Sequence, residues 1–379
     1  MIRIGNVKND FLNLENLPVF VPETIGNQTV KYRIYENDIL FTMTGTKGKR
    51  DYFFTTVVTK QEKILLLNQR VGCLRSFSTE LNMNYLSMLL KGKYILDSIF
   101  STETGNVSQG NIGSENTLNL FVALPPYVEQ QRIVKKVNSF FDLLNVMEER
   151  KRKLQDCIHD IKVKILDLAI HGKLVPQDPN DEPATELLKR INPKAEITCD
   201  TPQYGKLPNG WCEVQLGDVF NHNTGKALNA SNTEGSMKRY LTTSNVYWNA
   251  FDFTTVKQMY YKDSELDKCS ITKGDLLVCE GGDVGRAAIW NFNYDICIQN
   301  HLHRLRPKLG DLCVSLYYYV FYYLKVNNMI GGKGIGLLGL SSNALHKLHV
   351  PLPPINEQHR IVAKIEELFT QLDKIEASL

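Results

Sequence analysis

The sequence predicts a mixed α/β (α+β) protein in which two homologous domains are each followed by a long helix. One segment, LPPYVEQQRIV from Leu124, returns 228 positions later as LPPINEQHRIV from Leu352, with eight of eleven positions identical. Short apolar runs that end in glycine-containing turns indicate strands before each copy. After each copy, apolar residues follow at alternating spacings of four and three, which is typical of a helix with one apolar seam.

Further segments pair at similar offsets, so the duplication extends well beyond the LPP motif. IRIGNV at Ile2 matches LTTSNV at Leu241, NDILFTMTGTKG at Asn37 matches GDLLVCEGGDVG at Gly274, and LNQRVGCLR at Leu67 matches IQNHLHRLR at Ile298. A repeat of this length exceeds solenoid units of roughly 20 to 50 residues. The pattern therefore predicts two homologous domains.

Within each copy, DILFTM and DLLVCE are expected to form strands that lead into glycine-containing loops. Residues 317–324, YYYVFYYL, form an apolar run that fits a buried helix or a buried strand. Periodicity does not decide between these two.

The first long helix is expected to begin at Pro125 and Pro126, because proline suits the first helical turn, and to end near His171 and Gly172. At about 1.5 Å per residue, such a helix is about 65 Å long. Its seam has eleven positions, one of them polar: Ile133, Val137, Phe140, Leu144, Met147, Lys151, Leu154, Ile158, Ile161, Ile165 and Leu168. The second helix repeats the seam at Ile361, Ile365, Leu368, Leu372, Ile375 and Leu379.

The domain boundaries follow from this pattern. We expect a first domain over 1–123, a helix over 124–172, a connector over 173–206, a second domain over 207–350 and a second helix over 351–379. The prolines and Asp-Pro turns of the connector indicate an ordered segment, with one short helix over 184–191.

Composition excludes several classes of protein. Apolar residues make up 43% of the chain and charged residues 22%, as in ordinary globular proteins. The sequence contains neither a long apolar run nor a signal-peptide pattern, so we expect a cytoplasmic protein with no membrane contact. Its eight cysteines form no CxxC pair, which argues against zinc modules and disulfide frameworks. A net charge of +3 makes no general case for nucleic acid.

Three motifs suggest chemistry that their context does not support. GIGLLG, at 334–339, matches a dinucleotide-binding glycine pattern but lacks the flanking strand and helix. LPPY at Leu124 resembles a methyltransferase signature, but leucine cannot accept the hydrogen bond that the target amine would donate. His301 and His303 alternate in a predicted strand and share one face, without a Cys or acidic partner at metal-ligand spacing. We therefore expect no cofactor and no metal.

The duplicated EQxRIV motif and the connector sequence HGKLVPQDPNDEPA make the chain resemble the specificity subunits of type I restriction-modification enzymes over nearly its whole length. The resemblance implies two target recognition domains that read the two halves of a bipartite, asymmetric sequence in double-stranded DNA. The helices would form an antiparallel coiled-coil spacer and dock two methyltransferase (M) subunits, which the motor and endonuclease (R) subunits join. The chain itself would be non-catalytic and would direct adenine methylation and cleavage by its partners.

Physical chemistry also favours two domains on a rigid spacer, because the separation of half-sites follows from the separation of the domains that read them. The loops after the paired strands, TGTKGKR at 44–50 and GGDVGRA at 281–287, combine glycine with cations that can contact phosphates or a guanine edge. A solvated turn is the alternative. The candidate DNA-binding residues are Thr44, Lys47, Lys49, Arg50, Lys226, Asn229, Arg286, Ser342 and Asn343.

The helix starts repeat three polar residues, and these have two interpretations. The set is Glu129, Gln130 and Arg132, with Glu357, Gln358 and Arg360 in the second copy. The acids suit the positive end of the helix dipole, and this alone explains their position. Equally, one set in each copy could contact one M subunit.

Two other function classes remain open from the sequence. One is a free-standing or fused DNA adenine methyltransferase, and the other is a coiled-coil scaffold that binds proteins. Relative to the family pattern, the first domain is N-terminally incomplete and the second helix is C-terminally short. Five seam residues are then expected to lack an intramolecular partner and to form an exposed stripe: Ile133, Val137, Phe140, Leu144 and Met147.

Overall fold

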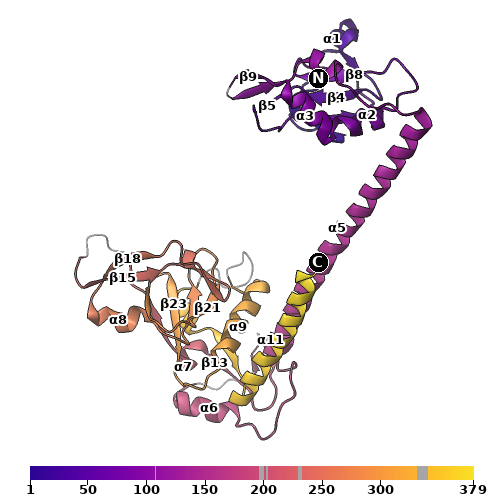
Figure 1. Cartoon of the computed structure of the whole chain (residues 1–379). Helices are drawn as coiled ribbons and strands as arrows, with labels where there is room; N and C mark the ends of the chain where they lie inside the picture. The colour runs from indigo at the N-terminus through magenta and orange to yellow at the C-terminus, as the bar shows by residue number, and fades with distance from the viewer. Residues whose placement is uncertain (107, 196–199, 202–203, 229–232, 331–339) are drawn as a thin grey trace. The chain divides into compact units, whose positions relative to one another are not determined.

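The computed structural model describes residues 1–106, 108–195, 200–201, 204–228, 233–330 and 340–379. The chain forms two compact units, Met1–Glu149 (unit 1) and Arg150–Leu379 (unit 2). One helix, α5 (Tyr127–Ile170), begins in unit 1 and ends in unit 2 (Figure 1). Each unit is described by itself.

Unit 1 is built around strand β4 (Ile39–Thr42), whose four side chains are all buried. β4 lies between β6 (Thr55–Val57) and β8 (Val71–Leu74) and is antiparallel to both. Its smaller sheets are β1–β2 (Val7–Lys8, Phe11–Leu12), β3–β7 (Arg33–Ile34, Leu65–Leu66) and β5–β10–β9 (Thr44–Gly45, Gln109–Asn111, Thr104–Asn106). Its shorter helices are α1 (Glu23–Gln28), α2 (Met83–Leu90), α3 (Lys93–Ser101) and α4 (Ser114–Leu118), with 3-10 turns at Ile4–Asn6 and Val30–Tyr32.

Unit 2 repeats this sheet and extends it. β20 (Leu276–Cys279) is buried between β21 (Ala287–Ile289) and β23 (Leu302–Pro307), and β14 (Phe220–Thr224) adds a fourth strand beside β23. The other strands are β11 (Asp200–Thr201), β12 (Gly205–Lys206), β13 (Cys212–Gln215), β15 (Ser236–Leu241), β16 (Val246–Tyr247), β17 (Ala250–Phe251), β18 (Lys257–Tyr261), β19 (Ser270–Ile271), β22 (Ile296–Ile298) and β24 (His349–Leu352). The helices are α6 (Ala184–Ile191), α7 (Leu216–Val219), α8 (Asp263–Cys269), α9 (Val314–Val326), α10 (Ser342–His346) and α11 (Ile355–Ala377), with a 3-10 turn at Thr243–Asn245.

The predicted strands β4 and β20 and the predicted connector helix α6 are confirmed. The two units also repeat one pair of hydrogen bonds between an arginine and a buried aspartate. In unit 1 the Arg75 guanidinium donates to both oxygens of buried Asp38, at 2.7 Å each. In unit 2 Arg306 makes the same two bonds to buried Asp275, at 2.8 and 2.7 Å. The two domains therefore share one internal frame.

The undecided run at 317–324 is helical, as part of α9. Leu316, Tyr317, Val320, Phe321 and Leu324 of this helix are all fully enclosed in the core of unit 2, which explains why the run lacks a polar face. Among the described helices, none combines the length and the apolarity needed to cross a bilayer.

The predicted antiparallel helix pair is confirmed within unit 2, where α11 lies along the C-terminal half of α5 (Figure 1). Lys151 Nζ donates to the carbonyl of Leu379 at 2.8 Å, and Lys162 Nζ lies 2.7 Å from the Asp373 carboxylate. α5 ends at Ile170, and Gly172 just beyond it has a φ of +64°, the left-handed conformation that closes a helix.

The buried stripe of α5 differs from the predicted seam in its C-terminal half. Ile158 and Ile165 are buried as predicted, but Leu154 and Ile161 are 40% and 42% exposed. The buried side chains of the last turns include Leu166, Ala169 and Ile170, which are not seam positions. A straight α-helix drifts by roughly 20° per heptad from a strict seven-residue repeat, so the stripe moves by one residue along the helix. The predicted seam was wrong at Leu154 and Ile161.

The N-terminal half of α5 bears the expected exposed stripe over only part of its length. Phe140, Leu144 and Met147 are all more than half exposed. Ile133 and Val137 instead line a hollow of about 910 Å³ together with residues of α2, and both are half-buried. The stripe without an intramolecular partner is therefore shorter than the sequence suggested.

Candidate nucleic-acid interface

The loop after β4 in unit 1 is held in one shape by hydrogen bonds to acidic side chains. The Asp51 carboxylate accepts a bond from the Thr46 amide at 2.7 Å, and bonds from Thr46 hold the pKa of Asp51 below its usual value. Glu103 accepts from the Gly48 amide at 3.1 Å and from the Tyr52 hydroxyl at 2.6 Å. Gly48 has a φ of +76°, which favours glycine. The loop is thus preorganised before any ligand arrives.

The three cations of this loop differ in what they already contact. Lys47 Nζ donates to the Gly105 carbonyl at 2.8 Å, and Arg50 lies 2.6 Å from the Asp97 carboxylate with its side chain about half exposed. Lys49 is exposed, and no hydrogen bond or ion pair is formed by its ammonium within the described chain. Lys49 is therefore the cation of this loop that is most available to a phosphate.

A polar hairpin that the sequence analysis missed lies against this loop. Strands β9 and β10 form the hairpin, and β10 pairs with β5, so that Asn111 lies opposite Thr44. At Gly105 a Cβ atom would lie 2.1 Å from the Gln109 carbonyl, so only glycine is tolerated there. The signal available in the sequence was the polar run TETGNVSQGN at 102–111, in which two Gly-Asn pairs flank a turn. The hairpin adds exposed Thr and Asn side chains beside the cations.

The corresponding loop of unit 2 carries acids as well as a cation. Asp283 lies 2.7 Å from the Lys325 ammonium, and Glu280 lies 3.7 Å from a ring nitrogen of His301. Arg286 folds inward: its Nη2 donates to the Thr243 carbonyl at 2.7 Å, and its guanidinium carbon lies 5.0 Å from the centre of the Tyr247 ring. A contact between Arg286 and a guanine stays a prediction. It would require Arg286 to leave the Thr243 carbonyl and the Tyr247 ring.

Lys226 also has internal partners. Its ammonium lies 2.6 Å from the Glu265 carboxylate and donates to the Tyr260 carbonyl at 3.0 Å, and its side chain is 11% exposed. The hydrogen bond from Lys226 lowers the pKa of Glu265, so the pair is ionic near neutral pH. In this structure, Lys226 is a structural cation, and its role in DNA binding would require the pair to open.

Ser342 and Asn343 lie in the first turn of α10, where both are exposed. Within the part of unit 2 that the structure describes, no hydrogen bond or ion pair joins them to Arg286 or Lys226. The predicted residues therefore form one loop in unit 1 and separate positions in unit 2. Asn229 and the GIGLLG segment at 334–339 lie outside the described residues.

The two histidines considered as a metal pair do not share a face. His303 is fully buried in β23, whereas His301 precedes the strand with a side chain that is 57% exposed. His303 Nε2 lies 2.7 Å from the Leu340 carbonyl, to which it donates, and its Nδ1 accepts from His222 Nε2 at 2.9 Å. Burial, reinforced by the nearby His303 and His346, lowers the pKa of His222 to about 4. Both rings therefore serve as neutral core groups.

The repeated glutamine of the EQxRIV motif ties each long helix to its own domain. The Gln130 side-chain oxygen accepts from the Asn82 amide at 2.8 Å, and that of Gln358 accepts from the Cys313 amide at 3.1 Å. Each side-chain nitrogen donates to the carbonyl of the first proline of LPP, at 2.9 and 2.8 Å. In both units the glutamine thus caps the start of the first helix after the sheet, α2 or α9.

The motif's charged residues are used differently in the two units. Glu357 is buried and accepts from the Trp211 indole nitrogen at 3.0 Å, and Arg360 lies 2.6 Å from Asp181 of the connector. Glu129 and Arg132 are exposed. Gln130, Glu357 and Gln358 are buried and have no exposed surface for a partner. The expected contact with an M subunit is therefore corrected for these three residues. For Glu129, Arg132 and Arg360, partner contact stays a prediction.

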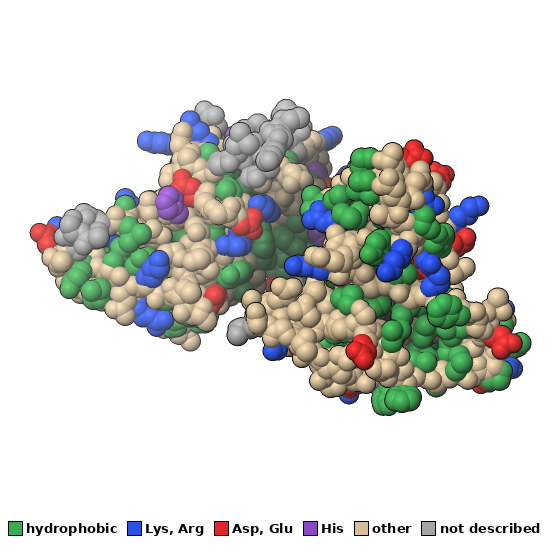
Figure 2. All heavy atoms as spheres, turned by 90° about the horizontal axis from the view of Figure 1, so that it is seen from above, with side chains coloured by type: hydrophobic (Ala, Val, Ile, Leu, Met, Phe, Trp, Pro, Cys, Tyr) green, Lys and Arg blue, Asp and Glu red, His purple; other side chains and the backbone are tan. Residues whose placement is uncertain are grey.

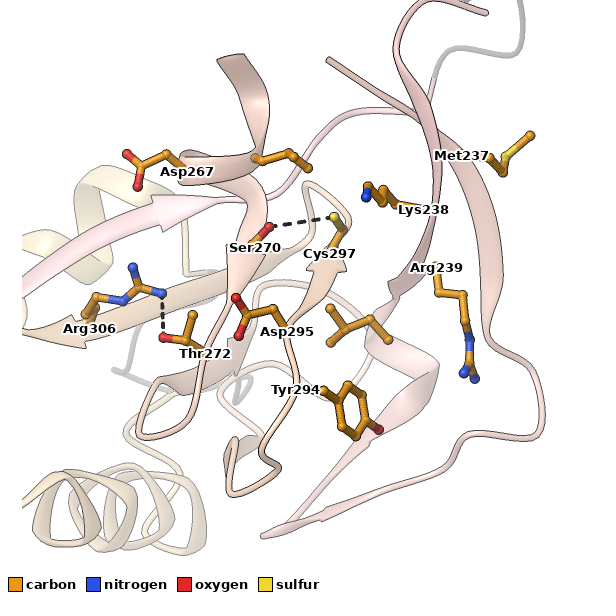
Figure 3. Close-up of a pocket in the computed structure, with 12 residues that line it drawn as sticks. Met237, Lys238, Arg239, Asp267, Ser270, Thr272, Tyr294, Asp295, Cys297 and Arg306 are labelled. Atoms are coloured by element: carbon orange, nitrogen blue, oxygen red, sulfur yellow. Dashed lines mark hydrogen bonds between the residues drawn. The ribbon is translucent and has the colours of Figure 1, made fainter. Parts of the chain in front are cut away.

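A separate hollow of about 600 Å³ lies between β15, β22, β19 and α8 (Figure 3). Lys238 and Arg239 of β15 face it from one side and Asp295 from another, while Arg306 donates to the Thr272 hydroxyl at 2.9 Å. On the face shown in Figure 2, Lys and Arg side chains are likewise interspersed with Asp and Glu. Charge alone therefore does not mark one binding surface.

With this geometry in view, comparison with known proteins decides the family. A family model described as the type I restriction modification DNA specificity domain matches residues 1–156 and 208–379. The chain belongs to this family. The two matched segments contain the two sheets and both helix starts, so the internal duplication corresponds to two copies of the specificity domain.

Curated members of the specificity family are similar over most of this chain. The EcoAI specificity subunit of Escherichia coli is 24% identical over 79% of this chain and 62% of its own length. The EcoKI specificity subunit of Escherichia coli strain K12 is 23% identical over 99% of this chain and 76% of its own. The chain spans about three fifths of the length of the EcoAI and EcoEI relatives.

Solved structures of this family share the fold. The superposition with the HsdS subunit from Thermoanaerobacter tengcongensis covers 91% of this chain and 76% of that subunit, with 18% sequence identity and a TM-score of 0.56. A structure titled for complex assembly and conformational transition of the type I R-M system matches 91% of this chain and 77% of its own, with 20% identity and a TM-score of 0.59.

Proposed function

We propose that this chain is a DNA specificity subunit of a type I restriction-modification complex that reads a bipartite, asymmetric sequence in double-stranded DNA. One observation carries the proposal: the two units repeat the same frame but differ in the loops that the frame presents. Arg75–Asp38 and Arg306–Asp275 have the same geometry. The loops beyond these frames carry different charges, with three cations at 44–50 and two acids and one arginine at 280–286.

This combination suits a protein that reads two different half-sites. A common frame fixes how each loop meets the duplex, and loop side chains supply the base contacts that differ between the half-sites. In unit 1, Lys49 would contact phosphate, and the hairpin at 104–111 would offer Thr and Asn side chains to a groove. The rigid α5 helix would set the gap between the half-sites, because half-site separation follows from domain separation.

In this proposal the chain is not an enzyme. It directs adenine methylation by two M subunits and cleavage by R subunits, in the cytoplasm. Exposed Glu129 and Arg132 at the start of α5 are the polar residues of the EQxRIV motif that an M subunit could contact. The methyltransferase alternative would place S-adenosylmethionine and a catalytic site on this chain.

The test is methylation in a host that lacks other adenine methyltransferases. We expect co-expression of this chain with a cognate M subunit to methylate adenines within one bipartite sequence, as mapped by single-molecule sequencing. The chain alone and the M subunit alone are the controls, and both should leave the genome unmethylated. Methylation by the purified chain alone would reject the proposal in favour of the methyltransferase alternative.

A further inference from the structure

Strands β15 and β18 form a two-stranded ribbon that extends past the rest of their sheet. Residues 236–240 pair with residues 257–261, whereas β22 pairs with β15 only at Tyr240 and Leu241. Residues 237–239 all border the hollow of Figure 3, so this hollow lies along the free edge of β15. The ribbon lies on the side of unit 2 away from α11 (Figure 1). It therefore projects from the domain as a separate element.

One face of the ribbon belongs to a small core. Side chains alternate along each strand, and residues directly opposite one another share a face. Tyr240 and Tyr261 therefore lie on the same face, where both are buried and pack with Cys269 of α8 and Cys297 of β22. This core fixes the ribbon to the domain.

The opposite face carries side chains that remain accessible. Met237 lies opposite Tyr260, and Arg239 lies opposite Gln258. Arg239 and Gln258 are exposed, and Met237 is 49% exposed. Figure 3 shows Met237 leaving β15 on the side away from Lys238. Within the part of unit 2 that the structure describes, no hydrogen bond or ion pair engages the side chain of Arg239 or Gln258.

The ribbon is positively charged. Its strands, SMKRYL and KQMYY, contain no Asp or Glu. They contain three cations: Lys238, Arg239 and Lys257. In Figure 3 the acids Asp267 and Asp295 lie on the Lys238 side of β15, away from Met237. The accessible face therefore suits a polyanion.

Two of the predicted DNA-binding cations hold the ribbon from inside the domain. Lys226 Nζ donates to the carbonyl of Tyr260 in β18 at 3.0 Å. Arg286 Nη2 donates at 2.7 Å to the carbonyl of Thr243, two residues after β15 ends. Both bonds restrain the ribbon backbone before any ligand arrives. Lys226 and Arg286 are therefore suited to positioning the ribbon, and Arg239 is the arginine that is free to contact a ligand.

We propose that the β15–β18 ribbon is a base-reading element of unit 2, in which Arg239 contacts a guanine and Gln258 contacts an adenine in the major groove. The proposal rests on the DNA-specificity function proposed above. The major groove is about 12 Å wide and admits a two-stranded ribbon, whose strands lie about 4.8 Å apart. Arginine matches the O6 and N7 acceptors of guanine, and glutamine matches N6 and N7 of adenine.

The pairing of the two strands also predicts the spacing of the two bases. Directly opposite side chains have Cβ atoms about 5 Å apart. This distance is close to the rise of about 3.4 Å between base pairs. Arg239 and Gln258 should therefore contact neighbouring base pairs within one half-site.

The test uses the full chain in complex with its M subunits and a panel of duplexes in which each base pair of the methylated sequence is replaced in turn. We expect Arg239→Ala to weaken binding to the unaltered duplex about tenfold. Binding to the duplex in which the contacted G·C pair is replaced should stay unchanged, because that contact is already lost. Gln258→Ala should behave in the same way at a neighbouring A·T pair. Both pairs should lie in the half-site that changes when residues 207–350 are exchanged.

Arg190→Ala is the matched control, because Arg190 is an exposed arginine of α6 in the same unit and pairs with Glu182. It should leave every affinity in the panel unchanged. Uniform weakening by Arg239→Ala across the panel would indicate a phosphate contact and overturn base reading. Loss of M-subunit assembly in Arg239→Ala would assign the ribbon to a protein interface and also overturn the proposal.

The wild-type complex separates this proposal from the function on which it rests. If the wild type discriminates among the duplexes and Arg239→Ala and Gln258→Ala bind them like the wild type, the ribbon does not read bases and the specificity function stands. If the wild type binds all duplexes of the panel equally, the specificity function fails and the role of the ribbon fails with it.

Discussion

Gln130 and Gln358, 228 residues apart, make equivalent hydrogen bonds: each accepts from the backbone amide that begins the helix following the sheet, Asn82 in unit 1 and Cys313 in unit 2. Both side chains are buried, so neither bond competes with water. A buried glutamine side chain thereby links the start of each long helix to its domain. The repeated EQxRIV motif has a structural function in both copies, whatever else it contacts.

We expect Gln358→Ala to lower the free energy of unfolding of unit 2 by about 2 kcal/mol, because it leaves a buried amide and a buried carbonyl without partners. All three tryptophans lie in unit 2, so tryptophan fluorescence during denaturation reports this unit. Gln130→Ala is the matched control, and its effect should fall on unit 1 and leave the tryptophan transition in place. Equal stability of Gln358→Ala and the wild type would show that the bond contributes nothing.

Loss of the free cation in the unit 1 loop should change the salt dependence of DNA binding. In the complex with M subunits, Lys49→Ala should reduce the slope of log affinity against log salt by about 0.9, the value for one phosphate contact. Lys189→Ala removes an exposed lysine of α6 and should leave the slope unchanged. An unchanged slope for Lys49→Ala would remove this loop from the interface.

Exchange of one domain should change one half of the recognised sequence. Replacement of residues 207–350 by the second domain of another family member is expected to alter a single half-site, because each unit has its own core and its own loops. Four residues inserted near Lys151 are the control, since a longer helix should change only the gap. A change in both halves after the domain exchange would show that the two units do not read independently.

Acid should destabilise unit 2 through His222. Its pKa is about 4 in the folded chain, against a usual value of 6.5. Between these values the unfolded state binds more protons, so the stabilisation is complete above about pH 6.5 and is lost as the pH falls toward 4. We expect denaturation monitored by tryptophan fluorescence to show that the free energy of unfolding of unit 2 falls over this pH range. The fall should be smaller in His222→Gln, in which the glutamine amide keeps a donor for His303. Burial raises the pKa of Glu357, so this carboxyl stabilises the folded state as the pH falls, opposite to His222. The quantity to compare is therefore the difference in stability between the wild type and His222→Gln at each pH. Identical pH profiles would contradict the assignment.

The sequence by itself determined the frame of this protein. The repeat identified β4 and β20, and Asp38 and Asp275, as equivalent positions of the two copies. The apolar spacing predicted α5 and α11, and the turn residues located α6. These features depend on local propensity, on periodicity and on the comparison of one half of the chain with the other. All of this information lies in neighbouring or repeated residues. The comparison also located the candidate DNA loops, because each follows a repeated strand.

Only the tertiary structure decided which side chains of those loops are available. Lys226 looks like a DNA-binding cation in the sequence, but Glu265, 39 residues later, neutralises it. Lys49 looks no different, yet its loop leaves it in solvent. Likewise, the shared face of Arg239 and Gln258 follows from strand pairing. The physical reason is the same in each case: the availability of a charge or of a strand face depends on groups that are distant in the chain and that only folding brings into contact.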